Sequence, residues 1–228
     1  MLRPLCTLHM VRHGETTANR KGIIQGHQDY ELTPIGVNQA AATAARLRGN
    51  TYWQAHSSDL KRASHTAEII LKEHPGATLS RTPLLREFAL GAQEGLPRGT
   101  TWNEARAIKA QEAGVSIDDY EECLRESPAD VQQRAQHFLA NLVADAISAE
   151  AASAETATAA AAAGSARLAL VVAHGGILNV MMLTEMGLEE AGIMGNCAVA
   201  VVDVFQEEGG RGRVQYVPRK LNDVSHVD

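Results

Sequence analysis

Short apolar segments that end abruptly in polar motifs constrain the fold of this chain more than any other feature. Residues 5–11 form a mainly apolar segment that stops at Arg12-His13-Gly14, and residues 168–173 form another that stops at His174-Gly175-Gly176. Between such segments, apolar residues recur at helical spacing. Strands that alternate with helices predict an α/β fold, in which helices cover both faces of a mostly parallel central sheet. We therefore expect a three-layer α/β/α arrangement.

The same pattern assigns residue ranges to the elements. Helix 34–48 opens with Thr33-Pro34, an N-cap residue followed by proline at the first helical position. Ser57-Ser58-Asp59 are expected to cap a second helix, which ends at Pro75-Gly76. The predicted strands are 5–11, 52–56, one near residue 79, 168–173, 198–205 and 214–217, and the further helices are 102–113, one from residue 128 and one from residue 177.

Residues 148–166 consist almost wholly of alanine, with serine, threonine, glutamate and one glycine. Alanine is the best helix former, so this stretch is expected either to extend the helix that begins at residue 128 or to form a flexible surface insertion. It has no apolar stripe that would dock firmly, and no chemistry is assigned to it. Residues 1–228 are otherwise expected to form a single domain.

Charge and cysteine spacing exclude several classes of protein. The formal net charge is −6 and no basic stretch exists, so a nucleic-acid partner is not expected. The cysteines Cys6, Cys123 and Cys197 lie far apart, which indicates neither a zinc site nor a disulfide framework. The apolar run at the start of the chain is too short for a signal peptide or a membrane span. We expect a cytoplasmic protein without a membrane partner, either a monomer or a homodimer.

Three polar motifs stand where a sheet of this kind binds its ligand. That place lies beyond the carboxyl ends of the strands. Arg12-His13, residues 57–62 and His174-Gly175 each follow a predicted strand. We therefore expect these motifs to lie together in one site.

The residue types in these motifs suit the cleavage of a phosphate monoester without a metal. Such cleavage needs fixed cations for the phosphate oxygens, an in-line nucleophile and an acid for the leaving oxygen. Arg12 and Arg62 supply permanent charge. The charge of Arg12 disfavours protonation of His13, which leaves a neutral and nucleophilic imidazole. Glu87 is the expected proton donor, and it would later serve as the base for water.

The chain carries several motifs of one known family in the same order. The first motif is Arg12-His13-Gly14-Glu15-Thr16, which Asn19 follows. The later ones are Ile23-Ile24-Gln25-Gly26, Leu32-Thr33-Pro34 with Gly36, Ser57 to Ala63, Leu85-Arg86-Glu87-Phe88, and Ala173-His174-Gly175-Gly176. In this order they resemble the histidine phosphatase superfamily, in its phosphoglycerate mutase-like branch. The resemblance covers residues 5–205, except for the alanine-rich stretch, and it is weak over 99–128.

The resemblance implies roles for individual residues. His13 would be the residue that is phosphorylated, and His174 would contact and stabilise the transferring phosphoryl group. Glu87 would act as general acid and then as base. The groups that hold phosphate oxygens would be Arg12, Arg62 and Asn19, and further substrate contacts would come from Gln25, Gly26, Ser57 and Gly175. Neither a cofactor nor a metal is expected, since no Asp/Glu/His cluster has ligand spacing.

Variable positions favour a phosphatase over a mutase. Mutases of this branch carry a tyrosine and a lysine after the acid, and paired arginines with a tyrosine that retain the substrate. Residues 88–98 lack the first pair, and 99–128 do not show the second arrangement. The expected function is a phosphomonoesterase that acts through a phosphohistidine on a small phosphorylated metabolite. The alternatives are a phosphoglycerate mutase or a catalytically silent binding relative, although both histidines and the acid are retained.

The substrate class follows from a narrower resemblance. Residues 23–26, residues 57–60 and the long insertion resemble TIGAR-like fructose-2,6-bisphosphatases. The glutamine and the further arginine that dedicated fructose-2,6-bisphosphatase domains carry near the second histidine are missing. Arg98 lies eleven residues after Glu87 and is a candidate contact for a second phosphate. A sugar bisphosphate, such as fructose 2,6-bisphosphate, is therefore the expected substrate class.

Overall fold

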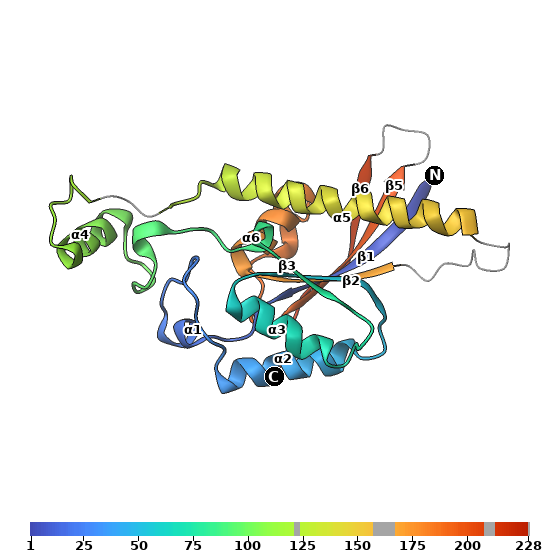
Figure 1. Ribbon diagram of the computed structural model, residues 1–228, viewed down its shortest axis with the longest axis horizontal. Coiled ribbons are helices and arrows are strands. Elements are labelled where there is room, and N and C mark those ends of the chain that lie inside the picture. Colours follow the sequence, from blue (N-terminus) through green and yellow to red (C-terminus); the bar gives the residue numbers. More distant parts are fainter. Residues whose placement is uncertain (121–123, 157–166, 208–212, 228) are drawn as a thin grey trace.

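A six-stranded sheet forms the centre of the protein (Figure 1). The structure is a computed structural model, and it describes residues 1–120, 124–156, 167–207 and 213–227. The strands lie in the order β3-β2-β4-β1-β5-β6. Each strand that the apolar pattern predicts is present, and most are longer than expected. Their bounds are β1 Leu2–Arg12, β2 Tyr52–Ser58, β3 Leu79–Thr82, β4 Arg167–Ala173, β5 Val199–Glu207 and β6 Val214–Asp223.

The sheet is mostly parallel, as predicted, but one edge is antiparallel. β3, β2, β4 and β1 all pair in parallel, whereas β5 runs antiparallel to β1 and β6 runs antiparallel to β5. Only residues 208–213 separate β5 from β6 in the sequence. So short a connection suits an antiparallel pair, because parallel neighbours need a crossover of a dozen or more residues.

Helices cover both faces of the sheet, which confirms the three-layer arrangement (Figure 1). Alternate residues of β4 point to opposite faces. Val171 packs with the apolar residues of α5 and α6, and Val172 packs with those of α2 and α3. The helix bounds are α1 Thr17–Lys21, α2 Pro34–Leu47, α3 Lys61–Leu71, α4 Trp102–Ala113, α5 Pro128–Thr156 and α6 Gly175–Val180.

Short helical turns join these elements. The 3₁₀ turns η1 and η2 precede α4, a π-helical turn η3 continues α6, and a 3₁₀ turn η4 follows it. Their bounds are η1 Pro83–Leu85, η2 Gly91–Gln93, η3 Met181–Glu185 and η4 Glu189–Ala191. None of the described helices has the length and apolar character that a membrane crossing requires.

The helix starts test the predicted caps. Thr33 caps α2 as predicted, since its side chain accepts a hydrogen bond from the backbone N–H of Gly36 at 3.0 Å. The caps predicted for α3 are wrong. Ser57 and Ser58 remain in β2, and the N-cap position is Leu60, whose side chain has no hydrogen-bonding group. Asp59 instead forms a two-pronged ion pair with Arg86, at 2.6 and 2.8 Å.

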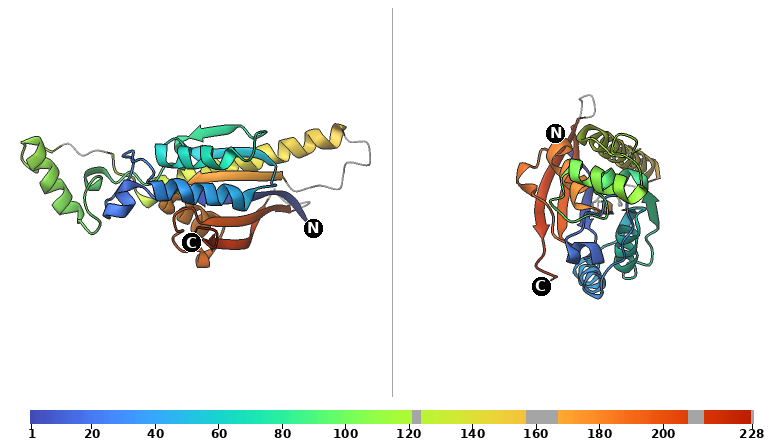
Figure 2. Two further views of the ribbon diagram at one scale, coloured as in Figure 1. Left: turned by 90° about the horizontal axis from the view of Figure 1, so that it is seen from below. Right: turned by 90° about the vertical axis from the view of Figure 1, so that its left-hand side faces the viewer.

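The ends of the molecule are formed by helices (Figure 2). α4 projects from one end, and the last turns of α5 reach the other. The alanine-rich stretch continues α5 as far as Thr156, so its helical alternative is confirmed up to that residue. Residues 157–166 lie outside the described residues. The five-residue helix α1 was not predicted, because it is too short to show an apolar period.

Candidate active site

Polar side chains converge where β1 and β4 end. Arg12 pairs with Ala173 in register, and the backbone N–H of His13 donates to the carbonyl of Ala173 at 3.0 Å. A cavity of about 310 Å³ lies against this edge of the sheet. The structure thus brings together most of the residues that the sequence singles out. Eight of the eleven predicted site residues line the cavity: Arg12, His13, Asn19, Gln25, Gly26, Arg62, Glu87 and Arg98.

His13 is held in one tautomer. Its side chain is buried, and its Nδ1 lies 2.8 Å from the backbone carbonyl of Gly14. A carbonyl only accepts, so Nδ1 carries the proton and Nε2 keeps a free lone pair. Burial, followed by the charges of Arg62 and Arg12, lowers the pKa of His13 well below its ordinary value. The neutral imidazole expected from the sequence is therefore present, although burial contributes more to it than Arg12 does.

His174 is held in the opposite tautomer. The Nε–H of Arg62 donates to His174 Nδ1 at 3.1 Å, so the ring proton sits on Nε2. That Nε2 is buried and has no hydrogen-bond partner among the described residues. The rings of His13 and His174 lie 5.2 Å apart between centroids. The pair therefore offers one free lone pair and one free donor, and burial with the charge of Arg62 lowers the pKa of His174 as well.

Two arginines bring positive charge to the same end of the cavity. Arg62, on α3, is 1% exposed and donates to the carbonyls of Gly26 at 2.8 Å and Gln28 at 2.9 Å. Burial lowers its pKa to about 10, so it stays charged at neutral pH. Arg12 donates to the carbonyl of Met194 at 2.7 Å, and its buried Nε has no partner among the described residues. Both guanidinium groups retain N–H donors for an anion.

α1 orients Asn19 toward this charge. Asn19 Oδ1 accepts from the backbone N–H of Thr16 at 3.1 Å, as half of a capping box. The Thr16 hydroxyl lies 3.0 Å from that oxygen and 2.9 Å from Gln25 Oε1. Since the oxygen of Asn19 is engaged in these contacts, its NH₂ group remains available to donate to a phosphate oxygen.

The chain before Gly26 is paired with the segment that ends at Arg98. Ile24 exchanges two backbone hydrogen bonds with Gly95 and Leu96, both at 2.9 Å, and the N–H of Arg98 donates to Gly22 at 2.7 Å. This pairing places Arg98 at the cavity, where its side chain is exposed.

Glu87 lies over the start of α6. Its carboxylate accepts the backbone N–H groups of Phe88 and Gly176, each at 2.9 Å. A Cβ atom at position 176 would come within 2.2 Å of Glu87 Oε1, so only glycine leaves room for the acid. Gly176 also lines the cavity, whereas Gly175 does not. Sequence reasoning chose Gly175 and missed Gly176, because the two are equivalent within the motif.

Two further predicted residues, His174 and Ser57, are fully buried. His174 lies next to His13 and Arg62, which both line the cavity. Ser57 is fully buried near the end of β2, and its hydroxyl has no partner among the described residues. Neither belongs to the lining residues, so a substrate contact by Ser57 remains a prediction.

Four of the residues that line the cavity are apolar, and sequence reasoning gave them no role in binding. They are Ile23, Ile24, Phe88 and Leu90. Three of them lie within or beside recognised motifs, which is the signal that was open to sequence reasoning. Among the described residues, no group of three or more His, Cys, Asp or Glu side chains is placed to hold a metal ion.

Comparison with known proteins agrees with the geometry of the site. The family model described as histidine phosphatase superfamily (branch 1) matches residues 8–216. The chain is 32% identical over 219 residues to a metal-independent phosphoserine phosphatase of Arabidopsis thaliana, a match that covers 96% of this chain and 82% of that protein. It is 40% identical over 139 residues to fructose-2,6-bisphosphatase TIGAR B of Danio rerio, which covers 59% of this chain and 52% of that protein.

A solved structure has the same fold. The crystal structure of phosphoglycerate mutase from Bacillus anthracis str. Sterne superposes with a TM-score of 0.69, at 21% identity, and the match covers 97% of this chain and 95% of that chain. This likeness confirms the phosphoglycerate mutase-like fold that the sequence motifs imply.

Proposed function

Because the chain belongs to branch 1 of the histidine phosphatase superfamily, we propose that it hydrolyses phosphate monoesters through a phosphorylated His13. Family membership makes it an enzyme with phosphatase or mutase activity on small phosphorylated metabolites. The observation that carries the proposal is the pair of opposite tautomers. His13 keeps a free lone pair on Nε2, and His174 keeps a free donor on Nε2, beside Arg12 and Arg62.

The first step forms the covalent intermediate. His13 Nε2 attacks the phosphorus in line while the bond from phosphorus to the ester oxygen breaks. Glu87 transfers its proton to that oxygen, which leaves as an alcohol. Arg12, Arg62, Asn19 and the Nε2–H of His174 hold the non-bridging oxygens, whose charge the buried donors stabilise without reorganisation.

The second step returns the enzyme to its starting state. Glu87, now a carboxylate, takes a proton from a water molecule, which attacks the phosphorus and displaces His13 Nε2. The products are inorganic phosphate and the neutral imidazole. The two arginines supply the positive charge that a metal would otherwise bring, so no metal enters either step.

The small number of cations in the cavity lining supports hydrolysis rather than mutase activity. A mutase must retain its released intermediate until that molecule rebinds in reverse, which needs fixed cations away from the phosphate-binding end. Among the described residues that line the cavity, Arg98 is the one arginine or lysine besides Arg12 and Arg62, and it is exposed. Incubation with 3-phosphoglycerate and a trace of 2,3-bisphosphoglycerate should therefore release inorganic phosphate and form little 2-phosphoglycerate.

The substrate class rests on Arg98 and on the relatives. Arg98 could bind the second phosphate of a sugar bisphosphate, which fits the similarity to TIGAR B. It could equally bind a carboxylate such as that of phosphoserine, in line with the longer match to the Arabidopsis phosphatase. Turnover of fructose 2,6-bisphosphate, phosphoserine and 2,3-bisphosphoglycerate, measured side by side, would decide among them.

Trapping the intermediate tests the proposed function. The enzyme is mixed with ³²P-labelled p-nitrophenyl phosphate, and the reaction is quenched rapidly. The protein should then carry a label on His13 that is labile in acid and stable in base. His13→Ala should lower turnover by at least about a thousandfold, as removal of a nucleophile does. His137→Ala is the matched control, because His137 is exposed on α5 and does not line the cavity. A label on another residue, or full turnover in His13→Ala, would refute the mechanism.

A further inference from the structure

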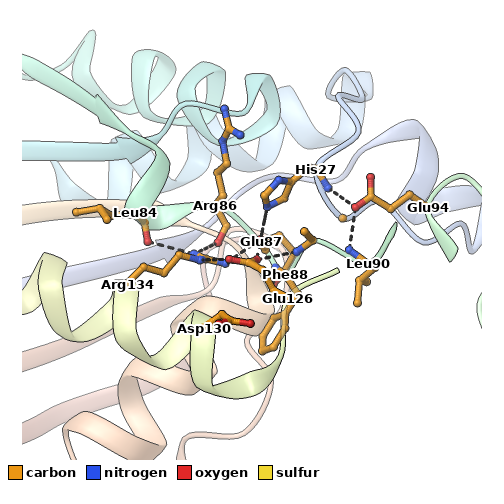
Figure 3. Close-up of polar contacts among 12 residues, drawn as sticks. His27, Leu84, Arg86, Glu87, Phe88, Leu90, Glu94, Glu126, Asp130 and Arg134 are labelled. Atoms are coloured by element: carbon orange, nitrogen blue, oxygen red, sulfur yellow. Dashed lines mark hydrogen bonds and ion pairs between the residues drawn. The ribbon is translucent and has the colours of Figure 1, made fainter. Parts of the chain in front are cut away.

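Arg134, on α5, makes an unusual set of contacts beside the proposed acid (Figure 3). Its Nη1 donates to the backbone carbonyls of Leu84, at 3.1 Å, and of Arg86. Its Nη2 donates to the carbonyl of Glu87 at 2.9 Å. Three carbonyls of one four-residue segment therefore converge on one guanidinium group. Buried carbonyls need such partners, and this segment obtains them from a side chain rather than from a strand or a helix.

A carboxylate completes the coordination of Arg134. Glu126 accepts from Arg134 Nε at 2.8 Å and from Nη2 at 3.0 Å. The five N–H groups of the guanidinium thus have five acceptors, and none is left for a substrate. Arg134 does not line the cavity, and its side chain is 13% exposed. In these respects it differs from Arg12 and Arg62, which keep free donors.

Glu126 also holds the chain just after this segment, at Ala89. Its carboxylate accepts the backbone N–H of Ala89 at 2.8 Å, and its own N–H donates to the carbonyl of Ala89 at 2.9 Å. Burial disfavours the charged form of Glu126, but the hydrogen bonds from Arg134 and Ala89 outweigh it and hold its pKa below the ordinary value. The carboxylate therefore stays ionised at neutral pH, opposite Arg134.

The side chain of His27 also reaches the backbone of Glu87. His27 Nε2 lies 2.8 Å from the carbonyl of Glu87 and 3.7 Å from Glu126 Oε2. The carboxyl group of Glu87 points the other way, toward the N–H of Gly176. The main chain at Glu87 is thus fixed from α5 and from the loop at residue 27, while its side chain faces the cavity.

We propose that Arg134 is a positioning residue, which sets the place of Glu87 over the cavity so that its carboxyl group meets the leaving ester oxygen. The inference rests on the general-acid role proposed for Glu87. General acid catalysis contributes about a hundred- to ten-thousand-fold and needs heavy-atom distances of about 2.6–3.2 Å. A displacement of about 1 Å can cost about a hundredfold. A residue that touches no substrate is therefore expected to affect proton transfer strongly.

A series of substituted phenyl phosphates tests this role. The substrates share one size and differ in the basicity of the leaving phenolate, so they report on proton donation. Arg134→Met is expected to lower kcat about a hundredfold for phenyl phosphate and less than about tenfold for p-nitrophenyl phosphate, whose leaving group needs little protonation. Arg134→Lys keeps the charge but not the planar fork, and should show the same selective loss to a smaller extent.

A double-mutant cycle separates positioning from a general loss of stability. If Arg134 acts through Glu87, adding Arg134→Met to Glu87→Gln should change kcat by less than about threefold, because the proton donor is already gone. The matched control is Arg81→Met, which removes an exposed ion pair with Glu68 and is expected to leave kcat unchanged. If Arg134→Met does not fold, as judged by circular dichroism, the cycle is run with Arg134→Lys.

Two outcomes would overturn the inference. One is an equal loss of kcat for all the phenyl phosphates in both Arg134 variants, and the other is a full additional loss in the Glu87→Gln background. Either result would leave Arg134 as a residue that only stabilises the fold. The labelling of His13 in the wild-type enzyme is measured first, so that a failure of the proposed mechanism is distinguished from a failure of the role of Arg134.

Discussion

At the scale of single residues, two neighbouring glycines have different environments. Gly175 and Gly176 both stand in the first turn of α6. A Cβ atom at Gly176 would meet Glu87 Oε1 at 2.2 Å and Phe88 at 2.8 Å, whereas one at Gly175 would meet Arg12 Nε at 3.5 Å, an ordinary contact. Alanine raises helix propensity equally at both positions. The pair therefore isolates the effect of displacing the acid.

We expect Gly176→Ala to lower kcat for phenyl phosphate by about a hundredfold, because it pushes Glu87 from its place. Gly175→Ala should have a clearly smaller effect. Steady-state kinetics on both variants, with folding checked by circular dichroism, would measure the difference. Equal losses in the two variants would mean that crowding at Glu87 is not what limits catalysis.

At the scale of elements, α2 and α3 clamp the loop that follows β1. The backbone N–H of Gly14 donates to Thr66 Oγ1 of α3 at 3.1 Å, and the Thr33 hydroxyl at the start of α2 lies 2.6 Å from Glu15 Oε1. Gly36 of α2 packs directly on this loop. A Cβ atom there would come within 2.1 Å of the Glu15 carbonyl oxygen, which belongs to the backbone and cannot rotate away.

Gly36→Ala should therefore move either α2 or the loop that carries His13. Such overpacking costs about 1–3 kcal/mol of unfolding free energy, and we expect turnover to fall with it. Gly76→Ala is the control, because a Cβ atom there meets nothing within 4 Å. Urea denaturation and initial rates measure both effects. A stable and fully active Gly36→Ala variant would show that the loop accommodates a shift of α2.

Sequence reasoning predicted elements better than contacts, for a physical reason. The continuous apolar run of β4 and the helical period of apolar residues along α5 both reflect burial, so each can be read from a single segment. The antiparallel direction of β5 depends on which strands become neighbours, and no local period encodes that. The candidate site shows the same difference between features that one segment encodes and features that depend on the folded chain. His13 and Arg62 stand in motifs, whereas Arg134 has none, because its importance arises from three carbonyls that only the folded chain brings to it.

At the scale of the whole molecule, burial of neutral histidines makes stability depend on pH. Burial lowers the pKa of His9 to about 4, with a further effect of Arg46, and it lowers those of His13 and His174. In the unfolded chain each imidazole has a pKa of about 6.5. Between the folded and unfolded values, the unfolded chain binds more protons. The contribution is therefore complete above about pH 6.5 and is lost as the pH falls through that window.

We expect the free energy of unfolding to decrease between pH 7 and pH 5, by about 1.4 kcal/mol per pH unit for each proton taken up on unfolding. Urea denaturation at intervals of half a pH unit measures this slope. His13→Asn should reduce the slope by the contribution of about one proton, since the amide does not titrate. A stability that is constant from pH 7 to pH 5 would mean that these imidazoles take up protons over the same pH range in the folded and the unfolded protein.

The position of the link between α5 and β4 has a consequence for how this lineage can diversify. Arg167 begins β4 and donates to the carbonyl of Ala149 on α5, so the chain enters the strand at the edge opposite the cavity. The seven residues of β4 then carry it about 20 Å to His174. A change of length between Thr156 and Arg167 thus alters the chain about 20 Å before His174, and we expect selection on catalysis to constrain it little. We expect differences of length among related proteins to concentrate in this segment, and an affinity tag inserted there to leave turnover unchanged.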